Sequence, residues 1–412
     1  MKTLLYIFTF TLIVSSAGAE EFIFKHKIGD KFKTISTSRE NVFLNGELLY
    51  GTQILNRMAS EVVDERNGVA IHKALFQLAE ERMSGDGASK SFQWTQDYES
   101  VFGRDSRGRI SIADKYIMPT VRNVPVFPER SINTGEKWDA EGYEAHDLGP
   151  SFGINSLYRL PFTAHYTFLG DRDWRGKPYK AVSISYTVNN SPEDFLEDAP
   201  LDFPGSRNGG LTPRRVHGES SQVVYWDSAL GQPVGAEENF KLIFEMSDGN
   251  VYEFSGNAEA EIIESPEMDK NAIAGDILRE LTDEGVDAAD VRVVEEGVKI
   301  NLEDIMFEPD TAILVPGEEK KLEKIGELLR RYPNRDILVG GHAARAGGTE
   351  RSRQQLSQER AAAIASYLIE QGVRSPDRII ARGYGSQNPI ADNTPEAGRK
   401  KNRRVEIIIL EN

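Results

Sequence analysis

The hydrophobic pattern changes its period near Ser265-Pro266, and this change constrains the fold more than any other feature of the chain. Before it, apolar residues recur at every second position, as Val182, Ile184 and Tyr186 do, which is typical of half-buried β-strands. After it, apolar residues recur at helical spacing and alternate with short apolar runs. We therefore expect an α+β multidomain chain, in which a β-rich region, an antiparallel sandwich or barrel-like sheet, precedes an α/β sandwich with a mixed sheet.

Within the β-rich region, residues 20–264, the Asp248-Gly249 pair separates two alternating apolar runs and predicts a hairpin. The segment 54–63 fits a helix and a strand equally well. The stretch 191–213, rich in proline, glycine and aspartate, predicts a long loop. An irregular stretch at 129–150 is a candidate boundary between two subdomains. Four tryptophans indicate either an aromatic core or a binding cleft in this region: Trp94, Trp138, Trp174 and Trp226.

The C-terminal part predicts a helical connector over 265–290, capped by Asp269 and ended by Gly285. Residues 291–412 then alternate strands and helices. The longest of these helices is expected to end at Gly372.

The first nineteen residues predict a secretory signal peptide. Lys2 precedes the apolar run Leu4–Val14, and Ala17-Gly18-Ala19 suits cleavage before Glu20. The alternative, an N-terminal membrane anchor, is disfavoured because the run is shorter than the ~18 apolar residues that a transmembrane helix needs, and no later segment reaches that length. The chain has no cysteine, which excludes disulfides, thiol nucleophiles and lipidation on cysteine. We expect a periplasmic protein that is associated with the cell envelope.

The net charge and the lack of known catalytic and metal-binding motifs exclude several classes of function. The net charge of −16 argues against nucleic acid as a partner, because phosphate binding requires a basic surface. The six histidines lack metal-ligand spacing, and neither a nucleophile elbow nor a phosphate loop is present. We therefore assign no catalytic residue, metal site or cofactor.

One arginine lies where an apolar residue is expected. Arg360 is four residues from both Leu356 and Ile364, on the apolar stripe of the predicted long helix. A guanidinium on a buried face needs a partner. With Arg353 it would form a carboxylate or phosphate site near the helix N-terminus; alternatively, it pairs with an internal carboxylate and only supports the fold.

A set of motifs in this part resembles the OmpA C-terminal-like domain family. The run Leu356-Ser357-Gln358-Glu359-Arg360-Ala361 lies between Gly341-His342 and Gly383-Tyr384-Gly385, and Asn388-Pro389 and Asn402-Arg403-Arg404 follow. The match covers about residues 291–412, in order and at near-family spacing. The resemblance implies a mixed sheet packed with helices and non-covalent binding of peptidoglycan through the diaminopimelate of its stem peptide. For residues 21–263 no family is recognised.

The resemblance also implies roles for individual residues. Arg360 stands where the family binds the carboxylate of the diamino acid, whereas Ala344 replaces the aspartate that receives its ammonium group. The loop Arg345–Ser352 is one residue longer than is usual in the family, and Arg353, which follows it, falls where asparagine is usual. The ligand-binding set implied is Arg360, Arg353, Glu308, Ala344, His342 and Asn402.

We expect from this a non-enzymatic envelope protein whose binding of the peptidoglycan stem peptide is weak or lost. A missing charge-assisted hydrogen bond is worth roughly 1.5–3 kcal/mol, or about ten- to a hundredfold in affinity. Its β-rich region would recognise another envelope protein. The alternative is a periplasmic enzyme or ligand carrier whose β-rich region acts on wall glycan or lipid. Facing carboxylates in a deep cleft, or an apolar tunnel, would favour this alternative. A packed core with flat faces would favour a structural protein that links the wall to another envelope component.

Overall fold

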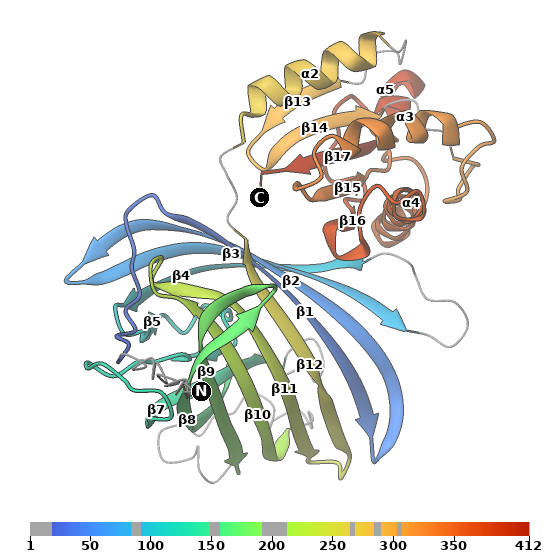
Figure 1. The fold of residues 1–412 in the computed structure, drawn as a ribbon. Helices are drawn as coiled ribbons and strands as arrows, with labels where there is room; N and C mark the ends of the chain where they lie inside the picture. The colour runs from blue at the N-terminus through green and yellow to red at the C-terminus, as the bar shows by residue number, and fades with distance from the viewer. Residues whose placement is uncertain are drawn as a thin grey trace, which may run out of the picture.

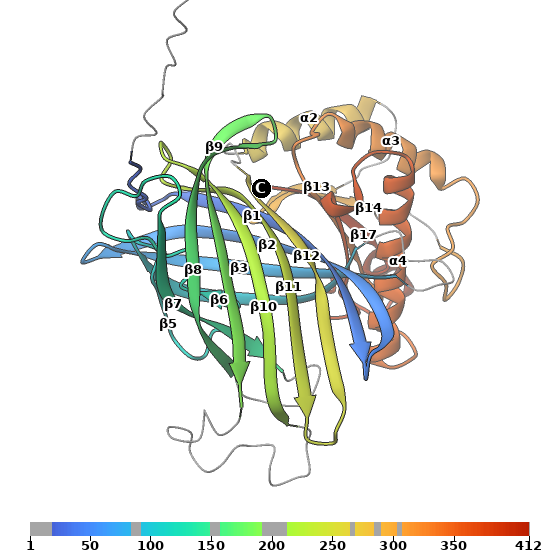
Figure 2. The same ribbon diagram turned by 60° about the horizontal axis from the view of Figure 1, so that its bottom comes forward.

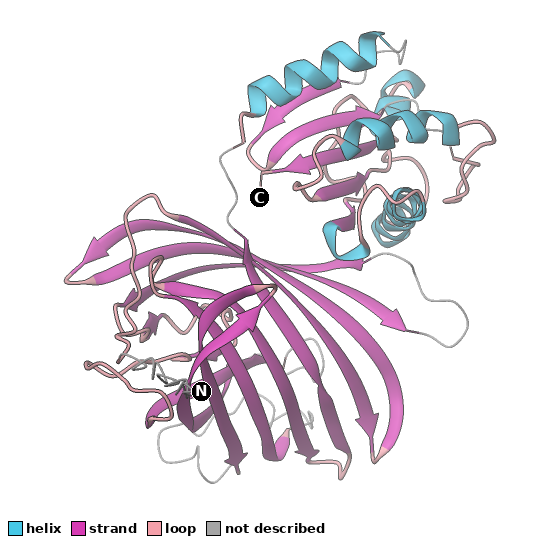
Figure 3. Cartoon of the chain, in the orientation of Figure 1, coloured by secondary structure: helices cyan, strands magenta, loops and turns pink. Residues whose placement is uncertain are grey.

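The computed structural model describes residues 19–83, 92–148, 157–191, 212–263, 268–283, 290–302 and 307–411. The predicted signal peptide, apart from Ala19, and nearly all of the loop predicted over 191–213 lie outside these residues. Figure 1 shows a long curled sheet from the N-terminal part and a smaller, helix-covered sheet from the C-terminal part. Figure 3 shows the same division by secondary structure, with the helices gathered on the C-terminal sheet. The predicted fold class is confirmed.

The N-terminal sheet is antiparallel throughout. Its strands are β1 (Lys31–Leu44), β2 (Glu47–Arg66), β3 (Val69–Met83), β4 (Phe92–Asp105), β5 (Ile110–Ile112), β6 (Val121–Arg122), β7 (Lys137–Asp147), β8 (Leu157–Trp174), β9 (Lys177–Asn190), β10 (Pro213–Asp227), β11 (Gln232–Met246) and β12 (Val251–Ile263). Each strand pairs with the next in sequence from β1 to β5 and from β6 to β12, and β1 also pairs with β12 along its length. The sheet is therefore a nearly closed, barrel-like ring whose opening lies between β5 and β6 (Figure 2).

Two segments that the sequence left open or described differently are strands. The segment 54–63, which fitted a helix and a strand equally, lies within β2. Within the stretch 129–150, which the sequence predicts to be irregular, residues Lys137–Asp147 form β7 and pair with β8. The alternate residues of β7 that face the sheet interior include Ala140, Gly142 and Glu144, so the strand lacks a clear apolar alternation. The sheet consequently continues through the expected subdomain boundary.

The interior of the curled sheet is packed with aromatic side chains. Phe22 and Phe24 of the segment before β1 are buried in the same cluster as Phe127 and Trp226. The rings of Phe22 and Phe127 stack with centroids 4.7 Å apart, and Phe24 meets Trp226 edge-on at 4.9 Å. Aromatic pairs at these distances are favourable beyond their buried area. Trp226 thus belongs to a core rather than to a cleft.

The C-terminal sheet is mixed. Its strands are β13 (Asp290–Val294), β14 (Gly297–Leu302), β15 (Ile337–Gly341), β16 (Ile379–Gly383) and β17 (Val405–Leu410), in the order β13-β14-β17-β15-β16, and only the β15–β16 pair is parallel. The helices are α2 (Lys270–Asp283), α3 (Glu319–Arg330), α4 (Glu350–Glu370), the 3₁₀ turn η2 (Pro376–Arg378) and α5 (Glu396–Asn402). The buried residues Ile277 and Leu281 place α2, expected as a connector, in the same core as Ile364 of α4 and Ile407 of β17.

The opposite face of the C-terminal sheet packs against the outside of the N-terminal sheet. Leu338, Ile380 and Ile408 share an apolar cluster with Leu55 of β2 and Ala79 of β3. Strand β16 also pairs in parallel with the start of β4, so that the two sheets form one continuous hydrogen-bonded array.

A buried ion cluster lies at this interface. Asp336, with none of its side chain exposed, accepts from Lys33 Nζ at 2.7 Å and Arg378 Nε at 2.7 Å, and Arg57 donates to the same carboxylate. Although burial alone would raise it, the charges of Arg57 and Lys33 hold the pKa of Asp336 at about 2. The two parts are thus joined by apolar, hydrogen-bonded and charged contacts.

Candidate functional site

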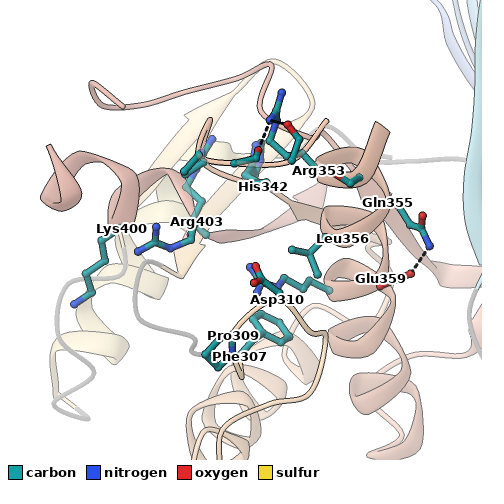
Figure 4. A pocket seen from close by; sticks show the side chains of 18 of the residues that line it. Phe307, Pro309, Asp310, His342, Arg353, Gln355, Leu356, Glu359, Lys400 and Arg403 are labelled. Atoms are coloured by element: carbon teal, nitrogen blue, oxygen red, sulfur yellow. Dashed lines mark hydrogen bonds between the residues drawn. The ribbon is translucent and has the colours of Figure 1, made fainter. Parts of the chain in front are cut away.

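The largest cavity described in the C-terminal part, about 1010 Å³, lies beside the N-terminal half of α4. Its other walls come from residues 307–315, from the loop after β15, and from α5 and the two residues between α5 and β17. Figure 4 shows how Phe307, Asp310, His342, Arg353 and Arg403 surround the opening.

Helix α4 reaches this position because glycine lies beneath it. A Cβ atom on Gly341, at the end of β15, would collide with the carbonyl oxygen of Ser357, so only glycine allows this approach. The fully buried Ser357 also accepts a hydrogen bond from the backbone N–H of Gly385. At the start of α4, Thr349 and Ser352 form a reciprocal capping box. The helix face that carries Arg360 is therefore fixed against the pocket.

Arg360 is held at its base and free at its tip. Its Nε donates to the carbonyl oxygen of Thr311 at 2.8 Å, and its guanidinium lies over the ring of Phe307, 4.9 Å from the centroid. Within the described part of the chain its terminal nitrogens have no hydrogen-bond partner, and no carboxylate forms an ion pair with it. Burial lowers the pKa of Arg360, and the Asp310 charge opposes this effect. Of the two interpretations left open by its spacing, this geometry favours the anion site.

Arg353 lines the same pocket, but its donors are used within the protein. Its Nε contacts Glu350 and Ser386, its Nη1 donates to the carbonyl oxygens of Gly347 and Gly348, and its Nη2 donates to Glu350 at 2.9 Å. Hydrogen bonds from the hydroxyl and backbone N–H of Ser386 to Glu350, followed by the one from Arg353, lower the pKa of Glu350 to about 2. Arg353 therefore fastens the loop before α4 rather than presenting free donors.

Two neighbouring residues form the wall opposite Arg360. Ala344 is buried and lines the pocket without contributing a polar side chain. The ring of His342 stacks on Tyr384 with centroids 4.8 Å apart, and its Nε2 lies 3.3 Å from Glu406. Burial lowers the pKa of His342. This wall thus offers a neutral imidazole and a methyl group where the family resemblance implies a carboxylate.

The remaining two residues of the predicted set do not line the pocket. Glu308 is exposed. Asn402 is almost fully buried, and its amide makes hydrogen bonds with Ile390, Ala391 and Asn393, which tie the loop before α5 to that helix.

Sequence reasoning missed several pocket residues: Asp310, Lys400, Arg403 and Arg404. Asp310 occupies a left-handed conformation, with φ of 57°, in the turn before Thr311, which aspartate tolerates better than most residues. Arg403 and Arg404 lie in the Asn402-Arg403-Arg404 motif, and their positive charge is the sequence feature that could have identified them as pocket residues. Arg403 is paired with Glu396, and Arg404 with Glu406. The pocket lining carries five basic and three acidic side chains, but Arg353 and Arg404 are paired with Glu350 and Glu406, which lie outside the lining. The terminal nitrogens of Arg360 are therefore the candidate contact for an anionic ligand.

Comparisons with known proteins match the part of the chain that contains this pocket. The OmpA family model matches residues 306–403. Outer membrane porin F of Pseudomonas fluorescens is 37% identical over 116 residues, 28% of this chain and 35% of that protein. Peptidoglycan-binding protein ArfA of Mycobacterium bovis is 38% identical over 105 residues, 26% of this chain and 32% of that protein. The match spans about a third of the length of these curated relatives.

A solved structure of an outer membrane protein from Borrelia burgdorferi B31 is 36% identical, covering 30% of this chain and 97% of that one, with a TM-score of 0.26. Among the helices in the described part of the chain, none has both the length and the apolar character that crossing a membrane requires.

Proposed function

We propose that the chain is a non-enzymatic, periplasmic protein of the cell envelope whose C-terminal domain binds the peptidoglycan stem peptide. The OmpA family model, which matches residues 306–403, supports this proposal. Support comes from relatives that include a peptidoglycan-binding protein and an outer membrane porin. The β-rich region, which no family match covers, would contact another envelope protein.

The observation that carries this proposal is the free end of Arg360. A guanidinium whose Nε is fixed by Thr311, and whose face is covered by Phe307, presents its two terminal nitrogens in a defined direction. This fork suits a carboxylate, which accepts two parallel hydrogen bonds. The carboxylates of a wall peptide are ligands of this kind.

The opposite wall limits what is bound. Because Ala344 supplies no carboxylate, the ammonium group of a diamino acid gains no ion pair at this position. We propose that recognition rests on the carboxylate alone, and that affinity for a free diamino acid is correspondingly low.

Co-sedimentation of the full chain with purified peptidoglycan tests the proposal. We expect wild type to sediment with the wall and Arg360→Ala to lose about ten- to a hundredfold in affinity, because charge-assisted hydrogen bonds are worth roughly 1.5–3 kcal/mol. Arg351→Ala is the matched control, since Arg351 is an exposed arginine of the same helix that does not line the pocket. Equal loss in both variants, or wall binding unaffected by Arg360→Ala, would refute the assignment.

A second candidate function, ligand carriage by the β-rich region, is favoured by a cavity between strands β7, β9 and β11 that contains Glu144 and Glu238.

A further inference from the structure

The packed interior of the curled sheet contains a cavity, of about 330 Å³, in which polar and aromatic side chains meet. Strands β7, β9, β11 and β12 contribute most of its lining, and Glu40 of β1 closes one side. A volume of this size lies at the lower end of the range for small-molecule pockets. The cavity is remote in sequence from the OmpA-family domain and is not covered by the family match.

Strand register explains why space remains at this place. Tyr186 of β9 lies opposite Ser220 of β10, which lies opposite Phe240 of β11. The row continues through Gly256 of β12 to Glu40 of β1. Directly opposed residues in an antiparallel sheet share a face. The row therefore has a small side chain at Ser220 and none at Gly256, between larger neighbours that project into the interior.

One wall of the cavity is aromatic. Phe244 and Phe254 meet edge-on with centroids 5.8 Å apart, and Phe240 lies on the same strand as Phe244. Tyr186 is fixed by stacking on Phe162 at 3.7 Å. Aromatic faces carry negative charge density and attract cations, and the attraction is strongest where water is excluded.

The other wall carries carboxylates. Glu144, only 9% exposed, accepts from the Tyr186 hydroxyl at 2.8 Å and lies 2.6 Å from His146 Nε2. Glu238 accepts from the Ser220 hydroxyl at 2.6 Å and from Gln222 at 3.1 Å.

The third carboxylate, Glu40, receives no hydrogen bond from any side chain or backbone group in the part of the chain that the structure describes. Burial, with the nearby Glu80 charge, raises its pKa to about 7. Burial also raises the pKa of Glu238, and the charge of Glu144 adds to this effect. These carboxyl groups therefore lack the positive partners that would favour their charged forms.

The basic residues of the lining do not neutralise Glu40 or Glu238. His146 contacts Glu144, and the ammonium group of Lys241 lies 2.9 Å from Glu253, which is outside the lining. Partly buried carboxylates are costly unless a cation or hydrogen-bond donor pairs with them. Aromatic rings beside carboxylates that lack a cationic partner are an arrangement suited to an ammonium group.

We propose that this cavity binds a small organic cation, with its ammonium group between Glu238 and Glu40 and its apolar body against Phe244 and Phe254. The proposal goes beyond peptidoglycan binding and stands independently of it, because it uses none of the residues around Arg360.

Isothermal titration of the full chain with benzylamine, and with the uncharged benzyl alcohol of similar shape, tests the proposal. We expect the amine to bind at least tenfold more tightly than the alcohol, and Glu238→Gln to remove at least tenfold of the amine's affinity. Glu99→Gln, a change of the same type at an exposed position of β4, should leave binding unchanged. Choline serves as a second probe, whose quaternary ammonium cannot donate N–H hydrogen bonds but retains attraction to the aromatic wall.

Glu40→Gln provides a second variant if Glu238→Gln disturbs folding, which the thermal midpoint of each variant reveals. The variant should weaken benzylamine binding in the same direction. The proposal is overturned if neither amine binds at millimolar concentration, if amine and alcohol bind equally, or if folded Glu238→Gln and Glu40→Gln variants bind as wild type does.

Discussion

Replacing Ala344 by aspartate should convert the pocket at Arg360 from a carboxylate site into a site for a zwitterionic diamino acid. The side chain of Ala344 lines the pocket opposite the N-terminal half of α4, in a wall that is otherwise a neutral imidazole and apolar groups. The pocket is about 1010 Å³ in volume, so a carboxylate at this position has room beside a ligand. Ala344→Asp then places an acceptor in the same cavity as the free guanidinium of Arg360.

The magnitude follows from the single interaction that is added. A charge-assisted hydrogen bond between the introduced carboxylate and a ligand ammonium group is worth roughly 1.5–3 kcal/mol, which corresponds to about ten- to a hundredfold in affinity. The surrounding basic side chains, of which Arg353 and Arg404 are already paired with protein carboxylates, stabilise the new charge in the unliganded protein. Because the carboxylate faces the pocket, the variant should lose no more than about 1 kcal/mol in the free energy of unfolding.

The assay is titration with a muropeptide that carries a free diaminopimelate amine and with the same muropeptide acetylated on that amine. Only the free amine should gain affinity from Ala344→Asp. Ala346→Asp is the matched control, because Ala346 belongs to the same loop and lining but is exposed. Equal gains for both ligands or for both variants would show that net charge, rather than an ammonium contact at position 344, governs binding and would refute the reasoning.

Three further predictions concern stability. Asp336→Ala should cost about 3–5 kcal/mol in the free energy of unfolding, measured with urea, because the buried Lys33 and Arg57 lose their carboxylate, whereas Asp276→Ala, in an exposed ion pair, should not shift the midpoint. Since the pKa of Asp336 is lowered to about 2, its stabilising contribution is complete above about pH 4 and is lost as pH falls towards 2; the difference in unfolding free energy between wild type and Asp336→Asn should shrink over that interval. Gly341→Ala should lower the free energy of unfolding by about 1–3 kcal/mol, because the added Cβ forces α4 away from β15. Gly275→Ala, on the open surface of α2, should raise it by about 0.5–1 kcal/mol. The thermal midpoints of the two variants in calorimetry should therefore shift in opposite directions.

The sequence predicted those parts of the fold whose signals are local. The helical stripe around Ile277 and the glycine at position 372 predict α2 and the end of α4, because helix periods and terminators are read within a few residues. In the β-rich region, the Asp248-Gly249 turn joins β11 to β12 as predicted. Strand β7 escaped detection because Ala140 and Gly142 give its inner face little apolar character.

The site was predictable only where one residue contradicted its surroundings. Arg360 was identified because a guanidinium on an apolar stripe demands an explanation, and the structure places it at the pocket. Asp310 and Lys400 were missed because they come from a turn and a short helix that only the folded sheet brings to the same cavity. Glu308 was chosen as the acidic residue of the opening segment, yet Asp310, two residues later, lines the pocket. A turn changes side-chain direction from one residue to the next, and sequence spacing does not report it.

The interface between the two sheets could not be predicted from the sequence. The ion cluster within it contributes more to the specificity of the arrangement than to its stability. Lys33 and Asp336 are 303 residues apart, so no local pattern links them. A buried cluster with one carboxylate and three cations is poor as a source of stability, because desolvation offsets much of the attraction; burial and the neighbouring Arg57 lower the pKa of Lys33 to about 7. Such a cluster is satisfied in one arrangement only, since sliding β16 along β4 by one residue would move Asp336 away from Lys33 and Arg57. The apolar contacts around Leu55 stabilise the association of the two sheets, and the ion cluster fixes their position relative to each other. The cavity in the curled sheet and the pocket at Arg360 are therefore held at a fixed orientation to each other.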